Sequence, residues 1–83
     1  MAVIHVTNVK VVSPYSLRLS FNDGTTKRVN LRHELYGEVF EPLRDPEEFA
    51  KARLEGWTVA WPNGADFAPE FLYELEPEGE PVN

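Results

Sequence analysis

The chain has 83 residues, of which 42% are hydrophobic and 12% aromatic; this suffices for one small domain with a compact core and excludes disorder of the whole chain. It has no cysteine, which excludes disulfides, thiolate nucleophiles and thiolate metal sites, and we expect a reducing, cytoplasmic location. The N-terminus has no basic stretch leading into an apolar run, and no apolar segment approaches about 20 residues, so neither export nor membrane insertion is expected.

The net charge of −6 is concentrated at the C-terminal end. Up to residue 64 the 8 bases are balanced by 8 acids, and every Lys and Arg lies between Lys10 and Arg53. The acids that follow have no base among them: Asp66, Glu70, Glu74, Glu76, Glu78 and Glu80. Such an end repels a phosphate backbone, so we expect no direct nucleic-acid binding by this chain alone.

The first half of the chain predicts a three-strand meander. Residues 3–12 are rich in β-branched side chains, residues 15–21 alternate apolar and polar, and residues 25–31 supply a return strand. A three-residue loop at residues 22–24 places Leu17 opposite Val29 and Leu19 opposite Lys27, which keeps one face mostly apolar. This register predicts a positive φ at Gly24.

Short helices and a fourth strand are expected in the second half. Residues 32–36 form at most one helical turn before Gly37. Asp45 is an expected N-cap with Pro46 in the first helical position, and we expect that helix to end before Gly56.

The next alternation predicts a short strand in which Trp57, Val59 and Trp61 share one face. Pro69 is then expected to open a last short helix that carries Phe71, Leu72 and Leu75. The predicted fold is therefore α+β: a small twisted antiparallel sheet, made of a three-strand meander plus a fourth strand, with two or three short helices. We expect a single domain over residues 1–75 and an acidic flexible tail over residues 76–83, because the tail has almost nothing to bury.

Several segments also match a known family pattern. They are Asp23-Gly24 after an alternating strand, residues 39–46 (VFEPLRDP), residues 59–66 (VAWPNGAD), Pro69-Glu70 and Leu72-Tyr73. Together they resemble the small bacterial family catalogued as domain of unknown function 2442, over nearly the whole chain. The WPNGAD stretch is the specific part of this resemblance.

The resemblance implies no activity, because none is assigned to that family. Members are typically short stand-alone proteins, and some are followed by a helix-turn-helix domain or encoded beside another small protein. This context implies regulation or a toxin–antitoxin-like pair. We expect this chain to lack the helix-turn-helix module of the longer relatives.

The most distinctive candidate site is the turn that contains Trp61, Asn63, Gly64 and Asp66. An indole donor, an amide and a carboxylate on one tight turn are able to hold a polar ligand or a partner's backbone. The competing interpretation, which we favour, is structural: Asn63 and Asp66 bond neighbouring backbone groups, Gly64 supplies a left-handed residue and Trp61 fills the core.

Other sites find little support in the sequence. His33, Glu34 and Glu38 fall short of a convergent metal site, so we expect no metal and no cofactor. His5 stands alone on the first strand, and no serine lies in a nucleophile elbow. The cations of the hairpin divide between two faces, because Arg28 points away from Lys27.

The sequence therefore favours a non-enzymatic protein-binding or regulatory module over an enzyme. We expect a protein partner, engaged by the acidic end, or a homodimer formed through the edge strand that begins at Val3. The alternative is a small-ligand binder or enzyme that uses the turn at residues 61–66.

Overall fold

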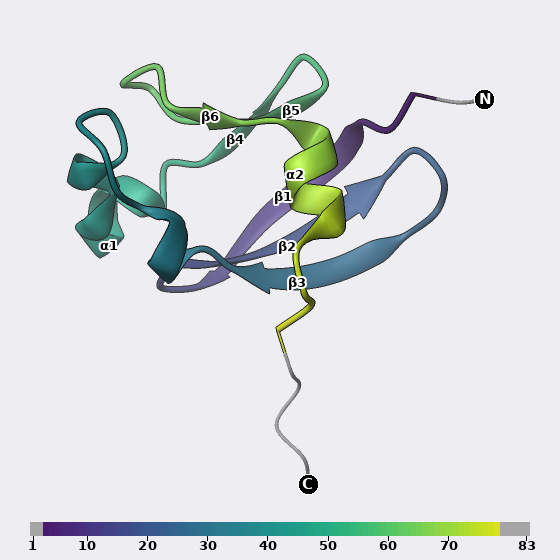
Figure 1. Cartoon of the computed structure of the whole chain (residues 1–83), viewed down its shortest axis with the longest axis horizontal. Helices are drawn as coiled ribbons and strands as arrows, with labels where there is room; N and C mark the ends of the chain where they lie inside the picture. The colour runs from purple at the N-terminus through teal and green to yellow at the C-terminus, as the bar shows by residue number, and fades with distance from the viewer. Residues whose placement is uncertain (1–2, 79–83) are drawn as a thin grey trace, which may run out of the picture.

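The computed structural model describes residues 3–78 and shows two three-stranded antiparallel sheets with short helical segments beside them (Figure 1). The elements in chain order are β1 (Val6–Ser13), β2 (Ser16–Phe21), β3 (Thr26–Asn30), the 3-10 turns η1 (Arg32–Glu34) and η2 (Glu41–Arg44), α1 (Pro46–Phe49), β4 (Arg53–Glu55), β5 (Thr58–Ala60), β6 (Asp66–Phe67) and α2 (Pro69–Glu74). The predicted α+β class is confirmed, but the strand expected as the fourth of one sheet belongs to a second sheet.

The first sheet has the predicted meander order β1-β2-β3 and the predicted register. Leu17 lies opposite Val29 and Leu19 opposite Lys27. The amide of Gly24 donates to the carbonyl of Phe21 at 3.0 Å, and Gly24 has φ 91°, as the three-residue loop requires.

The turn between β1 and β2 places an aromatic residue in a left-handed conformation. Ser13 pairs with Ser16, so Pro14 and Tyr15 are the two central residues. Tyr15 has φ 69°. Proline followed by a residue of positive φ is the pattern of a type II turn, in which glycine or asparagine is the usual second residue. Tyr15 is therefore held in a backbone conformation that an aromatic residue rarely adopts.

The second sheet, β4-β5-β6, replaces most of the predicted helix. Asp45 caps α1 as predicted, its side chain accepting from the amide of Glu47, but α1 ends at Phe49. Residues 53–55 instead pair with β5, and Glu55 lies opposite Thr58. Gly56 has φ 62° at the first position of this two-residue loop, which is typical of a type II′ hairpin. The expected continuation of the helix to Gly56 is wrong: residues 50–55 (AKARLE) are good helix formers, but hairpin pairing with β5 overrides this local propensity.

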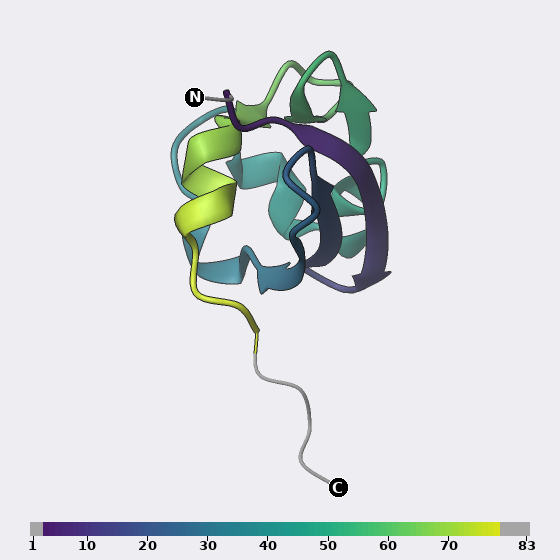
Figure 2. The same ribbon diagram turned by 90° about the vertical axis from the view of Figure 1, so that its right-hand side faces the viewer.

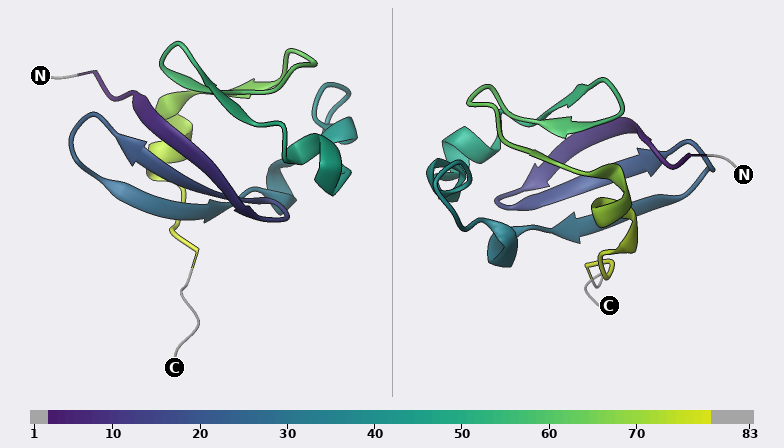
Figure 3. Two further views of the ribbon diagram at one scale, coloured as in Figure 1. Left: turned by 180° about the vertical axis from the view of Figure 1, so that it is seen from behind. Right: turned by 45° about the horizontal axis from the view of Figure 1, so that its top comes forward.

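Trp57 does not share the buried face of Val59 and Trp61. It lies in the hairpin loop, is 64% exposed and stacks on His5 with 5.3 Å between ring centroids. The amide of Val6 donates to the carbonyl of Trp57 at 2.8 Å. As a consequence, β1 runs beside the β4–β5 hairpin, as the view from behind shows (Figure 3). This contact joins the two sheets.

One core lies between the two sheets and α2. Figure 2 shows α2 on one side of the molecule and the curved strands β1 and β2 on the other. The core includes Leu17 and Val29 of the first sheet, Val59 of the second and Leu72 of α2, all with no measurable exposure. Of the three apolar residues predicted on the last helix, Leu72 is fully buried, whereas Phe71 is 38% exposed and Leu75 follows the last residue of α2.

After α2 the chain rounds the free edge of β3. Lys27, on the inner face, donates through Nζ to the carbonyls of Tyr73 and Leu75 at 2.6 Å each. The amide of Glu78 then donates to the carbonyl of Arg28, also at 2.6 Å. This segment covers an edge that would otherwise offer unpaired backbone groups.

Glu78 belongs to the predicted acidic flexible tail over residues 76–83, and it is bonded to the first sheet. Residues 79–83 lie outside the described residues, so the flexible tail and the domain boundary at residue 75 stay predictions. None of the helices in the described part of the chain has the length and apolar character needed to span a bilayer.

Candidate functional site

Trp61, the first residue of the candidate turn, belongs to the core. Its side chain is 1% exposed and packs against the rings of Phe49 and Phe67, with centroid distances of 5.6 and 5.9 Å. The indole Nε1 donates to the carbonyl of Phe49 at 2.9 Å. The indole donor therefore ties α1 to the second sheet and faces no solvent.

The turn itself is closed by its own backbone and side-chain bonds. The amide of Gly64 donates to the carbonyl of Trp61 at 3.0 Å, and the amide of Trp61 to the carbonyl of Ala65 at 2.9 Å. Asn63 Oδ1 accepts from the amide of Ala65 at 3.1 Å, while its Nδ2 donates to the carbonyl of Val39 at 2.9 Å. Gly64 has φ 93°. Asn63 and Gly64 thus have the local structural roles that favoured the structural interpretation.

Asp66 differs from the other three residues, because it is exposed and lines a surface hollow of about 280 Å³. We call this hollow the aromatic groove. It is lined by Glu34, Tyr36, Phe40, Asp66, Phe67, Ala68 and Phe71. The structure therefore does not bring the four predicted residues together around one ligand, and a ligand at Asp66 stays a prediction.

Stacked aromatic rings form the apolar part of the aromatic groove. The ring of Phe67 stacks on Phe40 at 4.7 Å and on Phe71 at 5.4 Å between centroids, with interplanar angles of 27° and 12°. Phe67 is buried, whereas Phe71 is 38% and Tyr36 65% exposed. Tyr36, in the loop after η1, was not singled out from the sequence, since nothing in its neighbours indicates that it lines the same hollow as Phe71.

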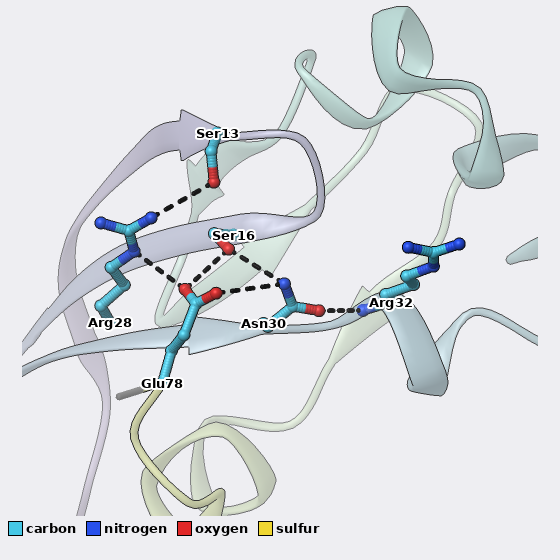
Figure 4. Close-up of polar contacts among 6 residues, drawn as sticks. All are labelled: Ser13, Ser16, Arg28, Asn30, Arg32 and Glu78. Carbon is cyan, nitrogen blue, oxygen red and sulfur yellow. Dashed lines mark hydrogen bonds and ion pairs between the residues drawn. The ribbon is translucent and has the colours of Figure 1, made fainter. Parts of the chain in front are cut away.

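A second polar constellation, also not predicted, holds Glu78 against the outer face of the first sheet (Figure 4). Glu78 Oε1 accepts from Ser16 Oγ and from Arg28 Nε, both at 2.8 Å. Its Oε2 accepts from Asn30 Nδ2 at 3.3 Å. The pKa of the Glu78 carboxyl is lowered, chiefly by the hydrogen bond from the Ser16 hydroxyl. Partial burial opposes this shift, whereas Arg28 and Asn30 add to it. We call Ser16, Arg28, Asn30 and Glu78 the C-terminal clasp.

Two further groups with shifted pKa values, Asp23 and Lys27, lie where α2 meets the β2–β3 hairpin. The phenol of Tyr73 donates to Asp23 Oδ2 at 2.7 Å, and this bond is the main cause of a lowered pKa of Asp23. Burial lowers the pKa of Lys27, and the nearby charge of Glu76 opposes that shift. These contacts fix α2 on the first sheet.

The remaining candidates stay apart from one another. His33 lines a different hollow from Asp66, and His5 stacks on Trp57. Within residues 3–78, no three His, Asp or Glu side chains gather closely enough to hold a metal ion. The start of the chain near Val3 is bound by Asn22, whose Nδ2 donates to the carbonyl of Val3 at 2.7 Å.

The profile of a family described as "Protein of unknown function (DUF2442)" matches residues 6–78 of this chain. The chain belongs to the DUF2442 family. No curated protein and no solved structure matched it.

The DUF2442 match covers every element from β1 to α2 and extends to Glu78. The aromatic groove and the C-terminal clasp therefore both lie within the matched region. The WPNGAD stretch, which carried the resemblance, forms the self-bonded turn and the start of β6. In this DUF2442 chain that stretch joins Trp61 in the core to Asp66 at the edge of the groove.

Proposed function

We propose that this chain is a non-enzymatic binding module whose partner is a protein, and that the aromatic groove binds a basic segment of that partner. The observation that carries the proposal is the composition of the groove. The exposed rings of Tyr36 and Phe71 contribute to its surface, and its two charged lining residues, Glu34 and Asp66, are both acids.

The exposed rings provide apolar area and π faces for a partner. Tyr36 and Phe71 are large side chains left in contact with water, and their burial by a partner is favourable. A guanidinium or ammonium group over an aromatic ring gains further electrostatic attraction. An arginine or lysine of the partner can thus lie on the rings while its charge meets a carboxylate.

The charge of the whole molecule supports a basic partner. The chain carries a net charge of −6, and both Asp66 and Glu70 belong to the base-free C-terminal part that forms β6 and α2. Such a field raises the rate of encounter with a positively charged surface. The regulatory, toxin–antitoxin-like role implied by the family resemblance also involves a protein partner.

The alternative function, a small-ligand binder or enzyme at residues 61–66, rests on Asp66 alone. The side-chain donors of Trp61 and Asn63 already bond backbone carbonyls of the protein itself, and Asn63 Oδ1 accepts from a backbone amide. Their contacts support the structural interpretation of this turn.

The test uses synthetic peptides on the isotope-labelled full chain. One peptide contains arginine, lysine and leucine, and the matched peptide replaces its bases by glutamate. We expect saturable binding of the basic peptide only, with amide shifts at Tyr36, Phe67 and Phe71. The Glu34→Gln/Asp66→Asn double variant should bind about fivefold more weakly, which is the upper end of the contribution of one exposed ion pair.

The control is the Glu47→Gln/Glu74→Gln double variant, which removes two exposed charges outside the groove. It should change the affinity less than twofold. Binding that survives Glu34→Gln/Asp66→Asn but disappears on deletion of residues 76–83 would place the partner on the acidic end and overturn the assignment to the groove. Preference for the acidic peptide would overturn the proposal altogether.

A further inference from the structure

A second hollow, of about 410 Å³, is formed beside η1 and η2. We call it the cationic hollow. It is lined by Tyr15, Arg32, His33, Leu35, Tyr36 and Arg44, which come from the β1–β2 turn, η1 and η2. Only Tyr36 is shared with the aromatic groove.

The charge of the cationic hollow is opposite to that of the molecule. Its lining contains two arginines and a histidine and no acid. Within residues 3–78, Arg28 and Arg53 each pair with a carboxylate, whereas Arg32 and Arg44 do not. The hollow therefore combines two uncompensated guanidinium groups in a chain of net charge −6.

Both arginines are held in place by neutral partners. Arg44 Nε donates to the carbonyl of Leu35 at 2.7 Å, and the carbonyl of Arg44 accepts from the phenol of Tyr15. The guanidinium of Arg32 lies over the ring of Tyr15 at 5.9 Å, and its amide donates to Asn30 Oδ1 at 2.9 Å. Carbonyl and aromatic partners orient the guanidinium groups without neutralising them.

Tyr15 contributes the strained backbone of this arrangement. Its φ of 69° is unfavourable for an aromatic residue, yet the type II turn places its ring between Arg32 and the core residue Phe49. Strained residues concentrate at functional sites, where the surrounding structure holds them in place. In this turn the positive φ of Tyr15 places its ring beside Arg32 and its hydroxyl against the carbonyl of Arg44 in η2.

We propose that the cationic hollow binds a small molecule that carries an oxyanion, phosphate or carboxylate, next to an aromatic ring. Two guanidinium groups offer the paired N–H donors that match either oxyanion. The rings of Tyr15 and Tyr36 provide an apolar wall for the rest of the ligand. The volume lies within the range of small-molecule sites, and a bound ligand would also contact Tyr36, which lines the aromatic groove.

The experiment titrates the labelled full chain with phenyl phosphate, benzoate and inorganic phosphate. We expect saturable shifts at Arg32, His33 and Tyr36, and tighter binding of phenyl phosphate than of inorganic phosphate. Comparison of phenyl phosphate with benzoate decides which oxyanion is preferred. Arg32→Gln/Arg44→Gln should weaken binding about tenfold or more, the loss expected for a charge-assisted hydrogen bond.

A matched control is Lys10→Gln/Arg18→Gln, which removes two exposed charges that face each other across β1 and β2. It should leave the affinity within twofold. Since Arg44 also bonds Leu35, Arg32→Gln is measured separately: its side chain is exposed and its loss should spare the fold. Equal weakening by the control pair, or saturable binding that is unchanged in Arg32→Gln and in the double variant, overturns the proposal; so does the absence of saturable shifts with all three anions.

Discussion

Ser16 shows how one buried polar residue determines the course of the chain after α2. Its side chain is polar, yet it has no measurable exposure to solvent. Its Oγ donates to Glu78 and accepts from Asn30 Nδ2 at 3.2 Å. A buried hydroxyl that lacks an acceptor destabilises a fold. The carboxylate of Glu78 supplies the acceptor for the Ser16 hydroxyl, which β2 leaves on the outer face of the sheet.

The lowered pKa of Glu78 predicts that the C-terminal clasp opens in acid. The carboxyl titrates below its ordinary value of 4.5, so the clasp contributes stability above that pH and loses it as the pH falls through the lowered pKa. A pH titration by NMR should show the Glu78 amide and the Arg28 side chain moving together. Glu78→Gln should give the open-state shifts at neutral pH, whereas Glu74→Gln, on the exposed side of α2, should titrate like the parent. Unchanged Arg28 shifts in Glu78→Gln would contradict the clasp.

Trp61 stabilises the fold through one hydrogen bond and through the packing of its ring. Trp61→Phe removes the donor to the Phe49 carbonyl and part of a fully packed ring, so the free energy of unfolding should fall by about 2 to 4 kcal/mol. Trp57→Phe is the matched control, because Trp57 is 64% exposed and its replacement should cost less than about 0.5 kcal/mol. Chemical denaturation measures both. Equal losses would mean that Trp61 is not the residue that joins α1 to β5.

Among the elements, the β4–β5 hairpin shows best where sequence patterns mislead. Residues 53–55 follow a well-capped helix and have no strand-forming pattern of their own, so the sequence predicts that the helix continues. The signal for the hairpin is the glycine before Trp57. A glycine at the first central position of a two-residue loop indicates a hairpin, and it moves Trp57 from the strand face to the loop.

The hairpin predicts a specific requirement at Gly56. A Cβ there meets nothing within 4 Å, so the penalty of substitution is conformational and not steric. Gly56→Ala should reduce the free energy of unfolding by about 1 to 2 kcal/mol. Gly56→Asn should lose clearly less, because asparagine is one of the residues found at the positive φ of hairpin turns. Thermal or urea unfolding compares the two variants, and identical losses would contradict a requirement for positive φ.

At the scale of the whole molecule, local features were predictable and long-range ones were not. The β2–β3 register, the positive φ of Gly24 and the cap at Asp45 follow from neighbouring residues. The Ser16–Glu78 bond joins residues 62 apart, and the aromatic groove unites residues 34–40 with residues 66–71. Periodicity carries no signal for such pairings, because each residue alone is compatible with an ordinary solvated face.

The shared core predicts that the two sheets unfold as one unit. Leu17 and Val29 of the first sheet and Val59 and Trp61 of the second belong to one buried cluster, and β1 is bonded to the β4–β5 loop through Val6. Because neither sheet can bury its apolar face without the other, a single cooperative transition is expected. In Trp57→Phe, fluorescence reports Trp61 alone, and amide signals of Leu17 and Val29 report the first sheet. Both probes should give the same urea midpoint; a lower midpoint for Trp61 would mean that the second sheet melts from a first sheet that folds independently.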